Sequence, residues 1–183
     1  LFGSPFDATK YETVLQACAL HADIAALPGG DMTEIGERGI NLSGGQKARV
    51  SLARACYADT DIVVLDDILS AVDAHVARTI TDKCLVELLR NRGKTVVLAT
   101  HQTLCLPSAN KIVVMKDGSI DFQGDFAATK AAGKLPYNFG KTVGEATNGD
   151  DGGESSGTTN AISIGAEDPV SYTHLRAHET SDY

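Results

Sequence analysis

The stretch at residues 62–67 constrains the fold of this chain more than any other. Four consecutive apolar residues, Ile-Val-Val-Leu, are followed directly by Asp66 and Asp67. A continuous run of β-branched residues and leucine is typical of a strand buried on both faces of a parallel sheet. Acidic side chains at the carboxyl end of such a strand lie where α/β proteins place their ligand chemistry. The run therefore predicts an α/β domain.

The segments after this run alternate between helix and strand patterns. Apolar residues recur at helical spacing from Val76 to Leu89, and residues 95–99 read as a second buried strand. The helix should end near Gly93, which follows two arginines. Residues 111–122 contain two strand patterns around Lys-Asp-Gly and predict a hairpin. Together these patterns predict a mostly parallel sheet plus a C-terminal hairpin.

Two helices are expected before the first strand. Thr9 and Glu12 fit a capping box, and the apolar spacing after them predicts a helix through about Leu20. A second helix should begin at the glycines of residues 43–46. Its apolar residues, including Leu52, should share one face, and its charged residues should share another.

The helix start at Ser43-Gly44-Gly45-Gln46 is a candidate anion site. Glycines there let backbone N–H groups approach an anion closely, and the helix dipole favours negative charge. Taken alone, Ser-Gly-Gly is most often only a turn or a helix cap. The basic amphipathic helix and the Asp-terminated strand that follow favour phosphate binding instead.

Three further polar residues follow predicted strands or precede a helix. Asp66 would suit a Mg²⁺ ion that bridges phosphate oxygens, although a strand-terminal aspartate can also cap the next turn. Asp73 fits the N-cap of the following helix. His101 follows the second strand, where a histidine alone would more often be packed or face solvent.

In this order the motifs resemble the second half of an ATP-binding-cassette (ABC) nucleotide-binding domain, a cassette of the P-loop NTPase (RecA-like) fold with a helical subdomain. Residues 43–46 match its signature motif, residues 62–66 its Walker B strand, residues 70–73 its D-loop and His101 its H-loop. The phosphate-gripping Walker A half has no counterpart in this sequence. The isolated chain is therefore expected not to hydrolyse ATP.

The resemblance narrows to one group of these domains. Residues 1–7, 17–20 and 33–39, with the Asp66-Asp67 pair, look like the first nucleotide-binding domain of C-type (multidrug-resistance-protein-like) ABC transporters. The match covers residues 1–140. Ile68 departs from the group, which usually has proline there.

The resemblance implies ATP and Mg²⁺ as cofactors and assigns roles to the motif residues. Two cassettes pair head to tail, so Ser43, Gly44, Gly45 and Gln46 would complete the ATP site built on the partner cassette, with Asp73 in the D-loop between them. Asp66 would hold Mg²⁺. Asp67 and His101 would be catalytic, and His101 would also contact the γ-phosphate. Asp67 stands where a competent cassette has glutamate, and its shorter side chain should position the attacking water poorly.

The parent protein implied by the resemblance is an integral membrane exporter that couples ATP hydrolysis to transport. Its partners would be a second nucleotide-binding domain and transmembrane domains, with this part on the cytosolic face of the membrane. The transported substrate cannot be read here. The alternatives are a soluble ABC-type ATPase of DNA repair or translation and a non-catalytic regulatory fragment.

Composition limits these classes. The net charge of −8 argues against a nucleic-acid partner. No apolar run approaches the ~18 residues that span a bilayer, so any membrane contact would come from parts missing here. No signal peptide is visible, and the first residue, Leu1 rather than Met, indicates a fragment.

The remaining features concern the C-terminal region and the cysteines. Residues 141–170 have the Gly, Asp, Ser and Thr content of a disordered linker. Residues 171–183 resemble a translated cDNA-library adapter and are expected not to be native. The four cysteines form no Cys-x-x-Cys pair, which favours reduced, packed thiols over metal or disulfide use.

Overall fold

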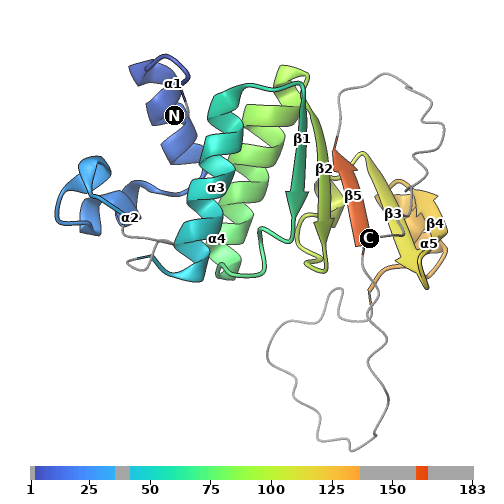
Figure 1. Cartoon of the computed structure of the whole chain (residues 1–183). Helices are drawn as coiled ribbons and strands as arrows, with labels where there is room; N and C mark the ends of the chain where they lie inside the picture. The colour runs from blue at the N-terminus through green and yellow to red at the C-terminus, as the bar shows by residue number, and fades with distance from the viewer. Residues whose placement is uncertain (1–2, 36–41, 137–159, 165–183) are drawn as a thin grey trace, which may run out of the picture.

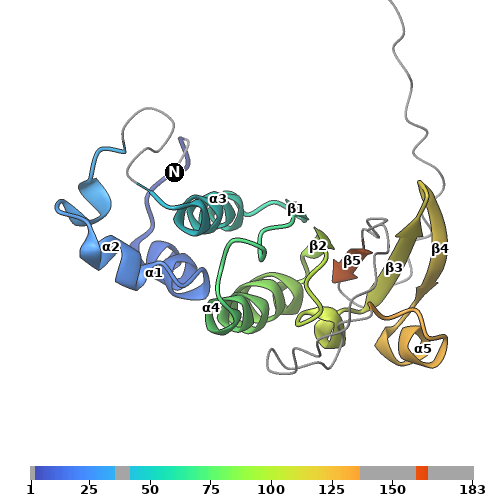
Figure 2. The same ribbon diagram turned by 90° about the horizontal axis from the view of Figure 1, so that it is seen from below.

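The computed structural model describes residues 3–35, 42–136 and 160–164, the last of these through its backbone alone. Helices gather on one side of the molecule and the strands extend away from them in one sheet (Figure 1). Seen along the sheet, α1, α2, α3 and α4 form a layer that ends beside β1, and β4 with α5 lies at the far end (Figure 2). The motif region lies where these two parts meet.

The N-terminal helices differ from the sequence prediction in their ends. Helix α1 spans Ala8–Ala17, and its N-cap is Asp7, whose side chain accepts from the backbone N–H of Lys10. The predicted capping box at Thr9 is therefore wrong, because the carboxylate two residues earlier already caps the helix. The helix stops before Leu20, since Ala19 adopts a left-handed conformation with φ of 54°.

The segment after α1 contains helical turns that periodicity did not predict. Helix α2 spans His21–Ala26, and the 3₁₀ turn η1 spans Gly30–Met32. Both are short and have no buried residue of their own. Such elements leave little periodic signal in a sequence.

Helix α3 spans Gly44–Ala58 and begins where the sequence predicted. The long helix after the first strand is split into α4, Ala74–Thr79, and a π-helical segment η3, Ile80–Leu89, which continues as the 3₁₀ turn η4, Arg90–Arg92. Gly93 then adopts φ of 80°, a left-handed conformation that suits glycine. The predicted end of this helix is confirmed.

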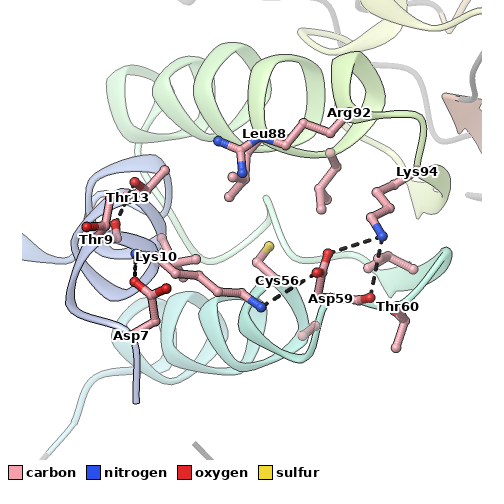
Figure 3. Close-up of a pocket in the computed structure, with 14 residues that line it drawn as sticks. Asp7, Thr9, Lys10, Thr13, Cys56, Asp59, Thr60, Leu88, Arg92 and Lys94 are labelled. Carbon is pink, nitrogen blue, oxygen red and sulfur yellow. Dashed lines mark hydrogen bonds and ion pairs between the residues drawn. The ribbon is translucent and has the colours of Figure 1, made fainter. Parts of the chain in front are cut away.

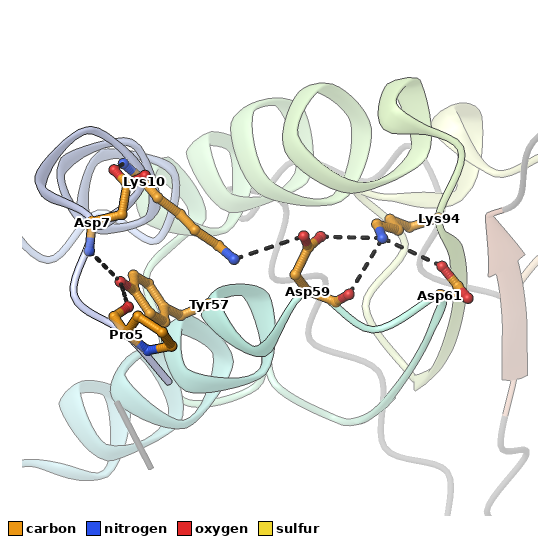
Figure 4. Close-up of polar contacts among 7 residues, drawn as sticks. All are labelled: Pro5, Asp7, Lys10, Tyr57, Asp59, Asp61 and Lys94. Atoms are coloured by element: carbon orange, nitrogen blue, oxygen red, sulfur yellow. Dashed lines mark hydrogen bonds and ion pairs between the residues drawn. The ribbon is translucent and has the colours of Figure 1, made fainter. Parts of the chain in front are cut away.

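Polar contacts tie α1 to α3 and to the residues just before strands β1 (Ile62–Asp66) and β2 (Thr95–Thr100) (Figure 4). The Tyr57 hydroxyl donates to the carbonyl oxygen of Pro5 at 2.7 Å and accepts from the N–H of Asp7 at 2.8 Å. Asp59, after the last turn of α3, forms ion pairs with Lys10 and Lys94. These contacts fix the first helix against the helix that carries the signature motif.

The sheet has five strands in the order β1-β2-β5-β3-β4. They span Ile62–Asp66, Thr95–Thr100, Asn160–Ile164, Lys111–Lys116 and Ser119–Gly124, in that spatial order. Strands β1 and β2 pair in parallel, joined through α4 and η3, with Asp66 opposite Ala99. Strands β3 and β4 pair antiparallel. Two short helical elements, η5 (Leu106–Ser108) and α5 (Phe126–Ala131), flank β3 and β4.

The predicted mostly parallel sheet is wrong for the described strands. Only the β1–β2 pairing is parallel, because β5 lies antiparallel to both β2 and β3. Strands β2 and β3 therefore run in the same direction with one strand between them. Strand β5 also lies inside residues 141–170, so the predicted disorder is wrong at Asn160–Ile164. The backbone groups of β5 pair with those of β2 on one side and β3 on the other. Composition alone does not reveal such pairing.

Strand β1 is not buried on both faces as its sequence predicted. Val63 and Leu65 are buried, whereas Ile62 is 58% exposed and Val64 is 73% exposed. Strand β1 is an edge strand with only β2 beside it, and in the described structure no element covers its second face. The core lies on the other face, against the helices. Its largest fully buried residues are Leu52, Leu69, Ile80, Leu85, Leu98, Leu106 and Ile112.

The role of β5 can be tested by Ile162→Pro. Position 162 pairs with Leu98 on one side and Ile112 on the other. Proline removes a donor and is excluded from central strands, so amides of β2 and β3 should exchange with solvent at least about tenfold faster. Hydrogen exchange followed by NMR measures this, with amides of β1 as the internal control. Unchanged exchange in β2 and β3 would contradict the pairing.

Candidate functional site

The signature residues form a complete capping box at the start of α3. Ser43 Oγ accepts from the N–H of Gln46 at 3.2 Å, and Gln46 Oε1 accepts from the N–H of Ser43 at 2.8 Å. The structural role of a helix cap is therefore confirmed for Ser43. The cap uses the N–H of Gln46, while the N–H groups of the first helical residues, Gly44 and Gly45, have no partner inside the helix. Donors remain available for an anion at this end.

The two signature glycines have different surroundings. A Cβ atom added to Gly45 would overlap with the carbonyl oxygen of Ala71, in the D-loop. A Cβ atom added to Gly44 would meet no atom within 4 Å. Gly45 therefore lets α3 approach the D-loop, whereas Gly44 faces open space. The sequence predicted one shared purpose for both glycines, and the structure separates them.

This difference gives a matched pair of variants. Gly45→Ala should lower the free energy of unfolding by about 1–3 kcal/mol, because the new methyl group must push the D-loop away. Gly44→Ala should leave stability unchanged or raise it by up to about 1 kcal/mol, since alanine is the better helix former. Urea unfolding followed by circular dichroism measures both. Equal effects of the two variants would mean that α3 does not pack on Ala71.

A partly buried ion pair holds the start of α3 against α2. Asp23 accepts from Gln46 Nε2 at 3.1 Å and from an Arg49 guanidinium nitrogen at 2.6 Å. The side chains of Asp23 and Arg49 are only 17% and 12% exposed. The pair fixes the Gln46 amide from the side opposite to Ser43. The role of Asp23 was not predictable from sequence, because no local pattern pairs a residue of one short helix with the next.

The sheet-edge group lies at the carboxyl ends of β1 and β2. His101 Nδ1 is 3.2 Å from Asp67 Oδ1, and the Thr100 hydroxyl donates to the same oxygen at 3.5 Å. The Asp67 N–H donates to the carbonyl oxygen of Ala99 at 2.8 Å, which fixes the turn after β1. The parallel register of β1 and β2 thus brings together two residues that are 34 positions apart. Asp67 and His101 were predicted as site residues from their motifs, whereas Thr100 was not.

Asp67 lies in a constrained turn. Its φ of 46° is left-handed, a region that aspartate enters more readily than most residues. The Ser70 hydroxyl and N–H both donate to its carbonyl oxygen, at 2.8 and 3.2 Å. The side chains of Asp67 and His101 remain 39% and 61% exposed. The pair can therefore reach a ligand at the sheet edge.

Asp66 lies on a different face from its neighbour. It belongs to the exposed set of β1 residues with Ile62 and Val64, whereas Asp67 turns toward β2 and His101. An exposed carboxylate at the end of a strand can bind a divalent cation through oxygen. The two adjacent aspartates therefore lie on different sides of the end of β1.

Asp73 is the N-cap of α4. Its side chain accepts from the N–H groups of His75 and Val76, at 2.9 Å each. The hydrogen bonds from Val76 and His75 hold the pKa of the Asp73 carboxyl below its usual value. The predicted cap is confirmed. The carbonyl oxygen of Ala71, in the same loop, lies close to Gly45. The D-loop and the signature motif therefore form one of the two groups of site residues.

A protein family and several individual proteins are similar to this chain. The family described as ABC transporter matches residues 10–70. ABC transporter C family member 3 of Dictyostelium discoideum is 54% identical over 126 residues, which cover 69% of this chain and 9% of that protein. Multidrug resistance protein mrp-7 of Caenorhabditis elegans is 57% identical over 125 residues, covering 68% and 8%. ATP-binding cassette sub-family C member 2 of Homo sapiens is 53% identical over 131 residues, covering 72% and 8%.

The chain belongs to the C-type ABC transporter family. The ABC transporter domain has the P-loop NTPase fold and binds ATP. The chain spans less than a tenth of the length of each of the three relatives above. Among its described residues, no helix has the length and apolar character that crossing a membrane requires.

Proposed function

We propose that this chain is the C-terminal part of the first nucleotide-binding domain of an exporter, and that its two groups of site residues serve two different ATP sites. The separation of the motifs supports this. Gly44 faces open space at the start of α3, while Asp67 and His101 pair at the edge of the sheet. Among the described residues, no hydrogen bond or ion pair joins the two groups. A head-to-tail pair of cassettes would use one group in each site.

The start of α3 fits a phosphate group of ATP. The N–H groups of Gly44 and Gly45 lie at the positive end of a 15-residue helix, and the space at Gly44 is open. The cap holds Ser43 in place through its acceptor oxygen, so its hydroxyl proton is still able to donate. These donors would bind the γ-phosphate of an ATP molecule held by the partner cassette.

The sheet edge fits Mg²⁺ and the attacking water. Asp66 would hold the ion, which when bound would offset the negative charge of the phosphate oxygens. His101, with its Nδ1 proton directed at Asp67, would keep Nε2 free toward the γ-phosphate. Asp67 would accept the proton of the attacking water, with a side chain one methylene shorter than that of glutamate. The bond to His101 orients its carboxylate.

The remaining parts of the proposal rest on the relatives. Proteins named as multidrug resistance protein and ATP-binding cassette sub-family C member match the chain at more than 50% identity. We infer a parent that couples ATP hydrolysis to transmembrane transport. Its partners would be a second nucleotide-binding domain and transmembrane domains, and this chain would lie on the cytosolic face of the membrane.

Single-site nucleotide trapping in the full-length protein tests the division into two sites. Asp66→Asn should weaken Mg²⁺-dependent retention of nucleotide at the site that contains Asp67, because a neutral amide binds Mg²⁺ less well. Retention at the site completed by Ser43 should change little. Ser43→Gly, which costs the helix cap only a few tenths of a kcal/mol, should show the opposite preference. Loss at both sites from either variant would contradict the proposal.

A further inference from the structure

Three of the four cysteines meet in the core of the helical layer. Cys18 follows α1, Cys56 lies in α3 and Cys84 lies in η3. The Cys84 sulfur is 4.0 Å from that of Cys18 and 3.4 Å from that of Cys56, and all three sulfurs lie within 4.8 Å of one another. Their residues are 0%, 6% and 0% exposed for Cys18, Cys56 and Cys84. The group is compact and buried.

The spacing of the three sulfurs matches that of ligands around one ion. Sulfurs bound in a plane at about 2.3 Å from a metal lie about 4 Å from one another. The Cys18–Cys84 sulfur separation of 4.0 Å equals that value, and the Cys56–Cys84 separation of 3.4 Å is shorter. A single buried thiol packs as a small apolar group and needs no other sulfur beside it. Cys105 is such a single buried thiol, and its S–H donates to the carbonyl oxygen of Gln102 at 3.4 Å.

The ligand set selects the class of ion. Thiolates are soft ligands and favour Cu(I) and Zn²⁺ among the ions of proteins. Structural zinc takes four ligands, and among the described residues no fourth histidine, cysteine or carboxylate joins the group. Three sulfurs and no other ligand suit Cu(I) better.

The cluster has an approach route from solvent. Cys56 is one of the side chains that line a pocket of about 290 Å³ between α1, α3 and η3 (Figure 3). Among the polar side chains that line it, Lys10 and Lys94 are ion-paired with Asp59.

We propose that Cys18, Cys56 and Cys84 form a three-thiolate site for one Cu(I) ion. Binding releases the thiol protons to solvent, and copper keeps its oxidation state. The ion would join Cys18, which follows α1, to α3 and η3 at one point of the core. Because α3 carries the signature motif, the bound ion should stabilise the layer that holds this motif.

An anaerobic competition experiment tests this site. The reduced chain is titrated with Cu(I) in the presence of bicinchoninate, a coloured Cu(I) chelator. We expect the chain to withdraw one Cu(I), to gain ultraviolet thiolate-to-copper absorption, and to raise its Tm by about 5 °C or more. Cys84→Ala should withdraw at least tenfold less copper, whereas the matched control Cys105→Ala should behave as the wild type. Equal loss in both variants would overturn the site.

A second measurement on the unmodified chain avoids dependence on how the variants fold. X-ray absorption at the copper edge should show three sulfur neighbours at about 2.3 Å. Two or fewer sulfurs, or withdrawal of Zn²⁺ but not of Cu(I), would overturn the proposal.

Discussion

Gly44→Asp in the full-length transporter is expected to lower ATP-driven transport at least about a hundredfold while expression stays normal. Gly44 faces open space at the positive end of α3, so the new side chain fits without disturbing the fold. Its carboxylate would occupy the place proposed for the γ-phosphate and would repel it. A hundredfold loss corresponds to about 2.7 kcal/mol of transition-state stabilisation. Uptake of labelled substrate into membrane vesicles measures this.

Gly44→Ala is the control for that experiment. It adds one methyl group and no charge at the same open position, so transport should fall far less than with aspartate. Gly44→Asn separates bulk from charge, since asparagine has nearly the same shape as aspartate. Near-normal transport by Gly44→Asp would mean that residues 43–46 are only a helix cap.

Asp67→Glu is expected to raise ATP hydrolysis several-fold at the site that contains Asp66 and His101. The longer side chain would bring the carboxylate closer to the attacking water while keeping the negative charge. It would also shorten the time for which nucleotide stays trapped at that site. Single-site trapping with labelled ATP, followed over time, measures both effects.

Asp67→Asn provides the opposite test at the same position. Overall transport should change little, because most turnover would come from the partner site completed by residues 43–46. If Asp67→Asn stops transport outright, then Asp67 is an effective general base and the two sites are not asymmetric. Unchanged trapping by Asp67→Glu would also contradict this assignment.

The local elements near the motifs were largely predictable from sequence. The start of α3 at residues 43–46 and the N-cap at Asp73 depend on residues two or three positions apart, and both occur as predicted. The end of the long helix at Gly93 also follows from local backbone preference. The start of α1 was mispredicted, because Asp7 and Thr9 offered competing caps within one turn.

Contacts between distant segments account for what sequence reasoning did not find. Spacing predicted reduced, packed thiols, and all four cysteines are buried. Only the crossing of three helical elements brings three of the sulfurs together. Likewise, only the backbone of Ala71 distinguishes Gly45 from Gly44.

The sequence by itself determined the family, the order of the motifs and the identity of Asp66, Asp67, Asp73 and His101 as candidate residues, because these depend on residue type and local spacing. The tertiary structure decided which of them meet. Parallel pairing of β1 and β2 joined Asp67 to His101 and left Asp66 on the open face. The tertiary structure also decided the order of the strands in the sheet. Strand β5 lies between β2 and β3, because the backbone N–H and C=O groups of both strands need hydrogen-bond partners.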